Sequence, residues 1–416
     1  MSSRPRLVVG TFAATAAAAL ALSGCGGLAT QSQVPLSEDC GESVLIGAPL
    51  PLSGPFTDFG TNSLQGMQIA VDEINAAGGI AALGGTQLEI QTGDTSTGDP
   101  AQASSATTKL IEDGSVALIG AWSSALTNSV STVAEEGRIP ILTQSWADTL
   151  SERGYEYYFQ PPPKSSQIGA AATSYLIDAA ESVGVSFDKV AGVGPNDVAN
   201  TAQITAAVDA FKAAGVAADE PTFYQLGLTD VTPIVTRIVE QAPDIILLSG
   251  SPADASLIVS GLRARGIETP ILGFGGAFVV PSFADLLGDD VEGLLAVGAW
   301  NADLPFDGVP EAAAAYQEAH GQFMPMEAGE SWVDVYLIAA AMEETASCDP
   351  EDIAGALREI DVTSGPAAAM PGGEVSFDED GTNPHAVPVL TQWVDGVPAT
   401  VWPEEYAAVE VDLGQE

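Results

Sequence analysis

One segment, residues 44–80, constrains the fold of this chain more than any other. Its first part, 44–46, is a short apolar run soon followed by prolines, and such a run is typical of a buried strand in a parallel sheet. A helix is predicted directly afterwards, because apolar residues recur at steps of three and four over 64–75 and Asn62 or Ser63 can cap its start. The loop between them therefore follows the carboxyl end of a strand, where open α/β sheets bind ligands.

The same alternation of apolar runs and amphipathic segments continues along most of the chain. This pattern predicts an α/β fold with parallel sheets covered by helices on both faces. We expect strands at 44–48, 88–92, 116–119, 139–142, 190–193, 222–225, 245–249 and 271–273. We expect helices at 64–75, 101–113, 124–136, 166–183, 199–214, 231–241 and 253–265, with Asp99 capping the second and Gly114 and Gly137 ending the second and third.

Two further features divide the chain into lobes. The proline triplet 161–163 is stiff and extended, so we place the first crossing between two lobes there. A strand and two helices within 294–345 are expected to return to the first lobe. The last two strands, 387–393 and 398–402, are expected to form a hairpin around Asp395-Gly396.

Residues 1–24 have the features of a bacterial lipoprotein signal peptide. Arg4 and Arg6 precede an apolar run, 7–22, that is too short and too rich in Ala and Thr for a good membrane span. Small residues before Cys25 resemble a lipobox, after which the chain is cleaved and the thiol is acylated; an ordinary signal peptide with an incidental Cys is the alternative. Residues 25–41 then read as a flexible tether. We therefore expect an extracytoplasmic protein held to the cell membrane by lipid alone.

Charge and cysteine content limit the possible partners. The chain has 12 Lys+Arg against 56 Asp+Glu, a net charge of −44, which argues against nucleic acid and against direct adsorption to anionic lipid. Cys40 and Cys348 remain once Cys25 is acylated, and two thiols in an oxidising compartment tend to pair. Two separate buried thiols are the alternative. With 46% apolar residues, the chain is long enough for two domains.

Reactive and metal-binding motifs are not found in the sequence. His320 and His385 have no metal-ligand spacing, and no nucleophile elbow or phosphate-binding loop occurs. Residues 273–276 are too incomplete for a dinucleotide fingerprint, and 378–381 match only part of a calcium loop, so a turn is favoured there. We expect neither an enzyme nor a bound cofactor or metal.

Motifs in many parts of the chain resemble those of one protein family. They lie at 46–60, 64–80, Asp94, 99–101, 120–124, 138–140, 150–155, 243–244, 261–266 and 375–381. In this order they closely resemble the Leu/Ile/Val-type (type I) periplasmic binding proteins, the receptors that deliver amino acids and related solutes to ABC importers. The likeness extends from about residue 44 to about residue 395.

The resemblance implies an architecture and a function. The family fold is two doubly wound parallel-sheet lobes joined by three crossovers, which we place at 42–161 plus 298–372 and at 162–297 plus 373–410. The implied function is a monomer that closes around a small amino-acid-like, amide or carboxylate solute and delivers it to an ABC permease. A ligand-sensing partner of a signalling system is the alternative, because the same fold serves signalling receptors.

The first candidate site is the turn 120–124, where a strand end runs into a helix start. Unpaired amides there carry partial positive charge and serine hydroxyls add donors, so a carboxylate can bind without a buried cation. In the family, the serine aligned with Ser124 holds the ligand carboxylate. The alternative is that Ser123 or Ser124 only caps its own helix.

The second candidate site follows the strand at 139–142 and contains Gln144, Ser145 and Trp146. Amino-acid-binding members of the family typically have a Thr at the position of Trp146. An indole fills volume, stacks and offers one N–H donor, so we expect a flat or apolar ligand. Core packing is the alternative role for Trp146.

Two positions lack the acids with which amino-acid-binding members hold the ligand ammonium. By alignment the first falls at Lys164 and the second near Gly276 or Ala277. A buried ammonium without an anionic partner is costly, so we expect a carboxylate or amide without a free α-amino group. Lys164 would pair with an anionic ligand if it faces the cleft, or is a solvated lysine at the hinge.

Phe59 and Asn200 occupy positions where the family often has cleft tyrosines. Phe59 keeps an apolar wall and Asn200 keeps polarity. With Trp122 and Trp146, Phe59 predicts a roomy, partly aromatic pocket. Core packing is the alternative for each aromatic residue.

Overall fold

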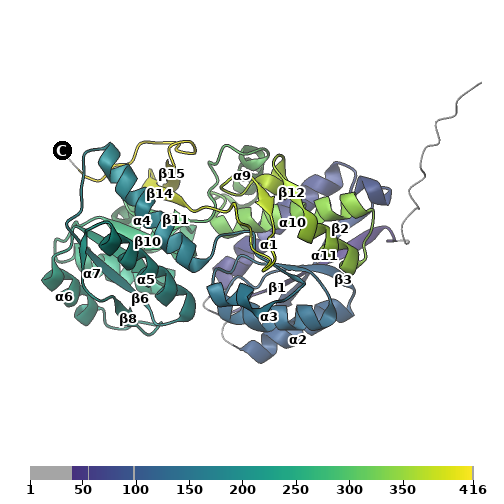
Figure 1. Ribbon diagram of the computed structural model, residues 1–416, viewed down its shortest axis with the longest axis horizontal. Helices are drawn as coiled ribbons and strands as arrows, with labels where there is room; N and C mark the ends of the chain where they lie inside the picture. The colour runs from purple at the N-terminus through teal and green to yellow at the C-terminus, as the bar shows by residue number, and fades with distance from the viewer. Residues whose placement is uncertain (1–39, 55, 97–98, 415–416) are drawn as a thin grey trace, which may run out of the picture. The chain divides into compact units, whose positions relative to one another are not determined.

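The computed structural model describes residues 40–54, 56–96 and 99–414, and Ser37–Glu416 form one compact unit. The predicted signal peptide, the lipidated Cys25 and nearly all of the predicted tether lie outside the described residues. Within the unit are two large β-sheets and a two-stranded ribbon of β12 (Asp361–Val362) and β13 (Val375–Ser376) (Figure 1). None of the described helices is long and apolar enough to span a bilayer.

The first sheet is entirely parallel and has five strands in the order β2-β1-β3-β4-β5. Its strands are β1 (Ser43–Leu50), β2 (Gln87–Asp94), β3 (Ser115–Ile119), β4 (Ile141–Leu142) and β5 (Tyr158–Phe159). The interior strand β1, between β2 and β3, is buried from Ile46 to Leu50. Burial on both faces explains why this strand reads as a continuous apolar run and does not alternate with polar residues.

The second sheet has eight strands in the order β15-β14-β11-β10-β9-β6-β7, with β8 also paired to β6. Its parallel strands are β6 (Lys189–Pro195), β7 (Ala217–Ala218), β8 (Thr222–Tyr224), β9 (Ile245–Ser249), β10 (Ile271–Phe274) and β11 (Leu295–Gly298). β14 (Val389–Val394) and β15 (Val397–Trp402) are added as an antiparallel hairpin at one edge.

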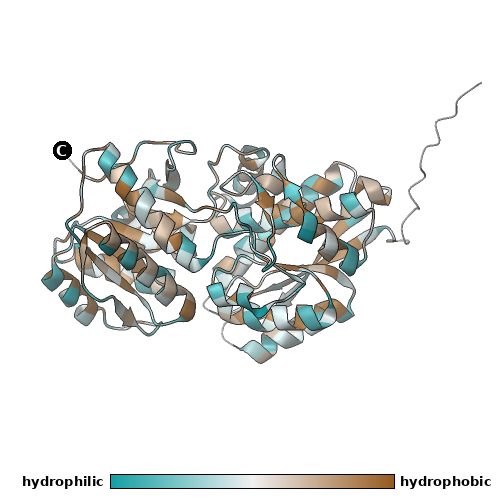
Figure 2. Ribbon diagram, in the orientation of Figure 1, coloured by the Kyte–Doolittle hydropathy of each residue, from teal (hydrophilic) through white to brown (hydrophobic). Residues whose placement is uncertain are grey.

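Helices cover both sheets and present apolar faces to them (Figure 2). They are α1 (Thr57–Ala76), α2 (Pro100–Glu112), α3 (Ser124–Gly137), α4 (Ser165–Ser182), α5 (Val198–Ala213), α6 (Thr232–Gln241), α7 (Pro252–Arg263), α8 (Pro281–Leu287), α9 (Val309–His320), α10 (Met326–Thr345) and α11 (Pro350–Glu359). The predicted α/β fold with two parallel-sheet lobes is therefore confirmed. The residue boundaries of the lobes stay a prediction.

The closest helix contact joins α1 and α10. Gly66 of α1 lies so near the backbone carbonyl of Ala328 that a Cβ at this position would collide with it. One and two turns further along α10, Trp332 Nε1 and Tyr336 Oη donate hydrogen bonds of 2.8 and 2.9 Å to Glu73 of α1. Segments about 260 residues apart in sequence thus form one helical layer beside the first sheet (Figure 1).

Most expected strands and helices are present, and the terminal hairpin forms with positive φ angles of 54° and 80° at Asp395 and Gly396. The expected cap of Asp99 is also present, because its side chain accepts hydrogen bonds from the amides of the first turn of α2. The fragment 378–381 is a turn, closed by a hydrogen bond from Gly381 N to Asp378 O.

Three details of the expected elements differ from the structure. The first helix begins at Thr57, so Asn62 and Ser63 do not cap it and instead lie buried on its inner face. The third helix runs through Gly137, and Arg138 takes the left-handed conformation with φ 57°. The strand within 294–345 does not return to the first sheet, because β11 pairs with β10 and β14. Only the helices that follow it pack against α1.

Cys40 and Cys348 form a disulfide, with their Cα atoms 6.0 Å apart. The bond joins the residues just before β1 to the turn between α10 and α11. It closes a loop across 308 positions of sequence. In the chain-entropy model, a disulfide that closes so long a loop greatly lowers the conformational entropy of the unfolded chain and so stabilises the folded state.

We predict that reduction of this disulfide lowers the free energy of unfolding by up to about 5 kcal/mol. The measurement is urea unfolding of a chain that begins at Gly26, with and without reductant, followed by circular dichroism. A Cys40→Ser, Cys348→Ser variant is the control, since reductant should leave its midpoint unchanged. Equal midpoints for the oxidised and reduced parent would contradict the prediction.

Candidate functional site

A cavity of about 570 Å³ lies where strands of both sheets end. Its walls come from the segments that follow β3, β4, β6, β9 and β10, together with the start of α1 and the start of α10. Carboxyl ends of parallel strands are the usual ligand positions in such sheets. Because both sheets contribute, a solute in this cavity would contact both.

Most of the predicted site residues line this cavity, and two do not. Those that line it are Phe59, Trp122, Ser123, Ser124, Gln144, Trp146, Asn200 and Gly276. Ser145 and Lys164 are absent from the lining, and both have partners elsewhere in the protein.

Lys164, which we named as a candidate ligand residue or a solvated lysine at the hinge, does not line the cavity. Its Nζ lies 2.6 Å from Asp380 Oδ2 on the turn that precedes the last hairpin, and only 20% of the side chain is exposed. Partial burial alone would raise the pKa of Asp380, but hydrogen bonds with Asp378 and with Lys164 lower it overall. Lys164 therefore ties the start of α4 to the 378–381 turn and offers no charge to a ligand.

Ser145 supports the site from behind. Its hydroxyl donates a hydrogen bond of 2.7 Å to the Trp122 carbonyl and lies 2.6 Å from Thr127 Oγ1. Trp122 has a positive φ of 59°, which is uncommon for a bulky residue. Ser145 thus fixes the backbone at the start of α3 and does not itself line the cavity.

The amino end of α3 presents hydrogen-bond donors to the cavity. Ser123 is the N-cap residue, but its side chain makes no capping hydrogen bond. Ser124 Oγ accepts a hydrogen bond of 3.3 Å from the Ala147 amide, which leaves its own O–H proton unused within the described part of the chain. Unpaired amides of the first turn add to these donors. An acceptor group such as a carboxylate can therefore bind here.

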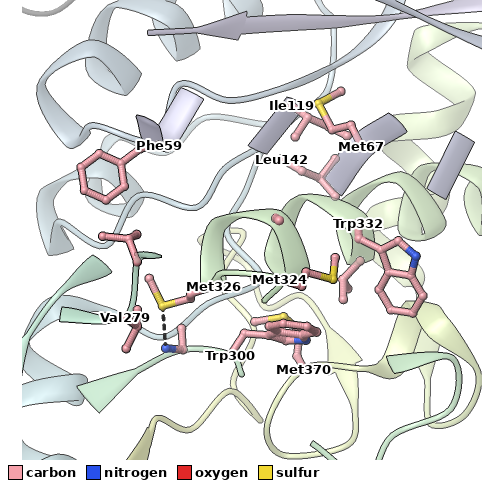
Figure 3. Packing of buried hydrophobic residues seen from close by; sticks show 14 of the residues in the cluster. Phe59, Met67, Ile119, Leu142, Val279, Trp300, Met324, Met326, Trp332 and Met370 are labelled. Carbon is pink, nitrogen blue, oxygen red and sulfur yellow. Dashed lines mark hydrogen bonds between the residues drawn. The ribbon is translucent and has the colours of Figure 1, made fainter. Parts of the chain in front are cut away.

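Aromatic side chains form one wall. Phe59 stacks on Trp122 with ring centroids 3.8 Å apart, and Phe56 meets Trp122 edge to face at 5.3 Å. Phe59 is only 1% exposed, so Trp122 supplies most of the open surface of this stack. Figure 3 shows Met326 below Phe59, with its sulfur accepting a hydrogen bond from the Ala299 amide at 3.2 Å.

Further polar residues of the lining were missed from the sequence. Gln203 and Ser165 are buried in the wall with Nε2 and Oγ atoms that have no hydrogen-bond partner among the described residues, and Ser251 also borders the cavity. Asn200 uses its Nδ2 to donate to Asp197 at 2.7 Å. The three missed residues, Ser165, Gln203 and Ser251, lie in the first part of α4 and α5 and just before α7. Examining the residues after every predicted strand would have found this region of the site.

The chain is similar in sequence and in fold to known proteins. A family profile described as periplasmic binding protein matches residues 43–396. The chain belongs to the periplasmic binding protein family. Membership makes it a non-enzymatic, solute-binding component of an ABC transport system.

Individual relatives span nearly the whole chain of this periplasmic binding protein. The Leu/Ile/Val-binding protein homolog 8 of Brucella melitensis is 28% identical over 386 residues, which cover 88% of this chain and 92% of the relative. The branched-chain amino acid transporter protein LivJ from Streptococcus pneumoniae, solved with isoleucine, is 24% identical with a TM-score of 0.73, covering 87% and 100%. A solute binding protein from R. palustris, solved with benzoate, is 19% identical with a TM-score of 0.73, covering 89% and 98%.

Behind the cavity, α10 of this binding protein carries three buried acids, which sequence analysis did not single out. Glu327, Glu330 and Asp334 are at most 1% exposed. Burial raises the pKa of Glu327 and of Asp334 to about 8 and raises that of Glu330 well above its ordinary value. Their spacing of three and four residues on an otherwise apolar helix face could have indicated from the sequence that they are buried. No cluster of acids, histidines and cysteines suited to a metal ion occurs in the described ranges.

We predict that Glu330→Gln makes the protein less sensitive to rising pH. A native pKa above the ordinary 4.5 means that the folded state keeps a proton which the unfolded state has lost, so stability falls as pH rises above about 4.5. The variant should lack this loss, which amounts to about 1.4 kcal/mol per pH unit. Urea unfolding at pH 5.5 and 7.5 measures it.

Glu344→Gln on the exposed face of α10 is the matched control for that comparison. Its unfolding free energy should follow the parent at both pH values. Parallel pH profiles of Glu330→Gln and the parent would mean that Glu330 is ionised in the folded protein.

Proposed function

We propose that this protein is an extracytoplasmic receptor that closes around a small amino-acid-like, amide or carboxylate solute and delivers it to an ABC permease. The observation that carries the proposal is the cavity of about 570 Å³, a size typical of small-molecule sites. It is built from strand ends of both sheets, with polar donors on one wall and aromatic rings on another.

The donors at α3 support an acceptor group at one end of the solute. No lysine or arginine is present among the described residues that line the cavity, so neutral donors would hold a carboxylate or an amide oxygen. Such donors are most effective at a helix amino end, where the amides are unpaired and oriented. The hydroxyls of Ser123 and Ser124 are placed there.

The aromatic wall supports an apolar or flat body for the solute. Trp122 and Trp146 are both partly exposed in the lining, and the Trp146 indole N–H has no hydrogen-bond partner among the described residues. A ring or a branched alkyl group would cover the indole faces. The isoleucine and benzoate of the two solved relatives have such bodies, and each carries a carboxylate.

A lipid anchor and closure by hinge motion complete the proposal. We infer that acylated Cys25 holds the protein at the outer face of the membrane, where a tether of residues 25–41 leaves the folded unit free to meet a permease. Contacts of one solute with both sheets would favour the closed arrangement.

We predict that a thermal-shift screen of the chain from Gly26 onward finds a stabilising solute among branched-chain amino acids, amides, urea, and aliphatic or aromatic carboxylates. A solute present at about a hundred times its dissociation constant adds about 2.7 kcal/mol to the free energy of unfolding. Sucrose at equal concentration is the control for non-specific stabilisation. The absence of a response to every class would contradict the proposed function.

We predict that Ser124→Ala weakens binding of the solute found in that screen by about tenfold, because one hydrogen bond to its acceptor group is lost. Ser129→Ala, on the same helix and outside the cavity lining, should leave the affinity unchanged. Isothermal titration calorimetry measures both. Equal affinities for the two variants would mean that the acceptor group does not lie at the start of α3.

A further inference from the structure

Two exposed aliphatic side chains line the cavity from the second sheet. Val198 and Leu226 are 64% and 48% exposed. They follow neighbouring parallel strands, because Pro195 of β6 pairs with Tyr224 of β8 (Figure 1). Single exposed apolar residues need no explanation, but a pair at a ligand cavity does. Outside the lining, the described part of the chain also exposes Val183, Val239, Leu257, Leu286, Val397 and Val409.

A buried acid holds the loop that carries Leu226. The amides of Gly227 and Leu228 donate hydrogen bonds of 3.0 and 2.8 Å to the two carboxyl oxygens of Asp254. Asp254 lies in the first turn of α7 and is 2% exposed. Leu226 is therefore kept at the cavity by an anchor in the protein interior, although its own side chain is half exposed.

Val198 begins α5 directly after a negatively charged residue, Asp197. Among the described residues that line the cavity, Asp197 alone has a charged side chain. Its Oδ1 and Oδ2 accept hydrogen bonds of 3.0 and 2.7 Å from the amide and the Nδ2 of Asn200. The carboxyl group is thus fixed beside Val198, and a second anionic group on a solute would be repelled there.

The exposure of the lining residues shows which part of the cavity is open. Phe59 and Ala277 are 1% and 4% exposed, whereas Val198 and Leu226 have most or half of their surface in solvent. The two aliphatic residues therefore lie at the open end. The donors at the start of α3 belong to the first sheet, so a solute held there by its acceptor group would reach the second sheet with its opposite end.

We propose that Val198 and Leu226 select solutes whose end opposite the acceptor group is an extended apolar chain. The assignment rests on the proposed function and adds the length and polarity of the solute. An apolar end that covers both side chains removes their surface from water, and a longer end removes more of it. A polar end gains nothing from these two residues, and a second carboxylate also meets Asp197. The solute class is a carboxylate or amide with a single polar head and an apolar tail.

Two series of probes that differ in chain length test the assignment. They are butanoate, hexanoate and octanoate, and the α-amino counterparts 2-aminobutanoate, norleucine and 2-aminooctanoate, so the result does not depend on an amino group. Isothermal titration calorimetry measures their binding to the chain from Gly26 onward. In the series that binds, we expect affinity to rise at least about fivefold for every two added methylenes, where complete burial would give about fifteenfold. A carboxylate at the far end, as in hexanedioate or 2-aminohexanedioate, should weaken binding at least about tenfold.

Val198→Thr and Leu226→Asn keep the approximate shape of each side chain and make its end polar. Each variant should at least about halve the gain in affinity from the hexanoate to the octanoate member and leave the butanoate member unchanged. Leu257→Asn is the matched control, because Leu257 is 44% exposed on α7 and lies outside the lining. It should keep the length dependence of the parent.

Several results would overturn the assignment and leave the receptor function intact. They are affinity that does not depend on length in the parent, an unchanged length dependence in both variants, and equal binding of the dicarboxylate. The same conclusion holds if neither series binds while another class in the thermal-shift screen does. If no class of solute binds to the parent protein, the proposed function fails together with the assignment.

Discussion

The close contact between α1 and α10 is the constraint on which the binding site depends. It requires glycine at position 66, because the carbonyl of Ala328 occupies the space that a side chain would need. This contact sets α10 beside the first sheet and brings Met326 to the cavity, next to Phe59 from α1, with Glu327 buried behind Gly276. The hydrogen bonds from Trp332 and Tyr336 to Glu73 then keep the two helices in register. One long-range backbone contact therefore determines which side chains lie under the solute.

Much of the fold and the strand-end part of the site could be predicted from local sequence. Buried parallel strands are apolar runs ended by Gly and Pro, and the residues after them fall at the ligand-binding edge whatever the helices do. Lys164 was misplaced because its partner, Asp380, is 216 residues away and no local pattern reports it. The start of α1 was missed because packing of Phe59 and Gly60 extends the helix before its periodic apolar stripe begins. The buried acids of α10 were not singled out, because their surroundings come from segments far away in the sequence.

The two sides of the cavity differ in how polar groups are kept uncharged: α3 presents neutral donors, and α10 carries buried acids with raised pKa values. At α3, an acceptor group would be held by uncharged donors. The oriented amides there carry partial positive charge although none of them is a titratable group. At α10, desolvation raises the pKa of Glu327 and Asp334, which favours the neutral form of these buried acids at pH 7. Neither place therefore requires an isolated charge in the interior. The chain has a net charge of −44, which already gives it a negative potential. Ionised acids beside the cavity would make the potential there more negative, whereas neutral ones do not.

The disulfide determines how a pull on the chain would be distributed. β1 lies between β2 and β3 in the first sheet, and a force applied to its first residue alone would open its hydrogen bonds one after another. Cys40 precedes this strand and is covalently joined to Cys348 in the turn after α10. Tension that arrives from upstream of Cys40 therefore passes into the helical layer through a covalent bond and bypasses the ladder of β1. The mechanical attachment point of the folded unit is a helix turn, although the chain enters through a strand.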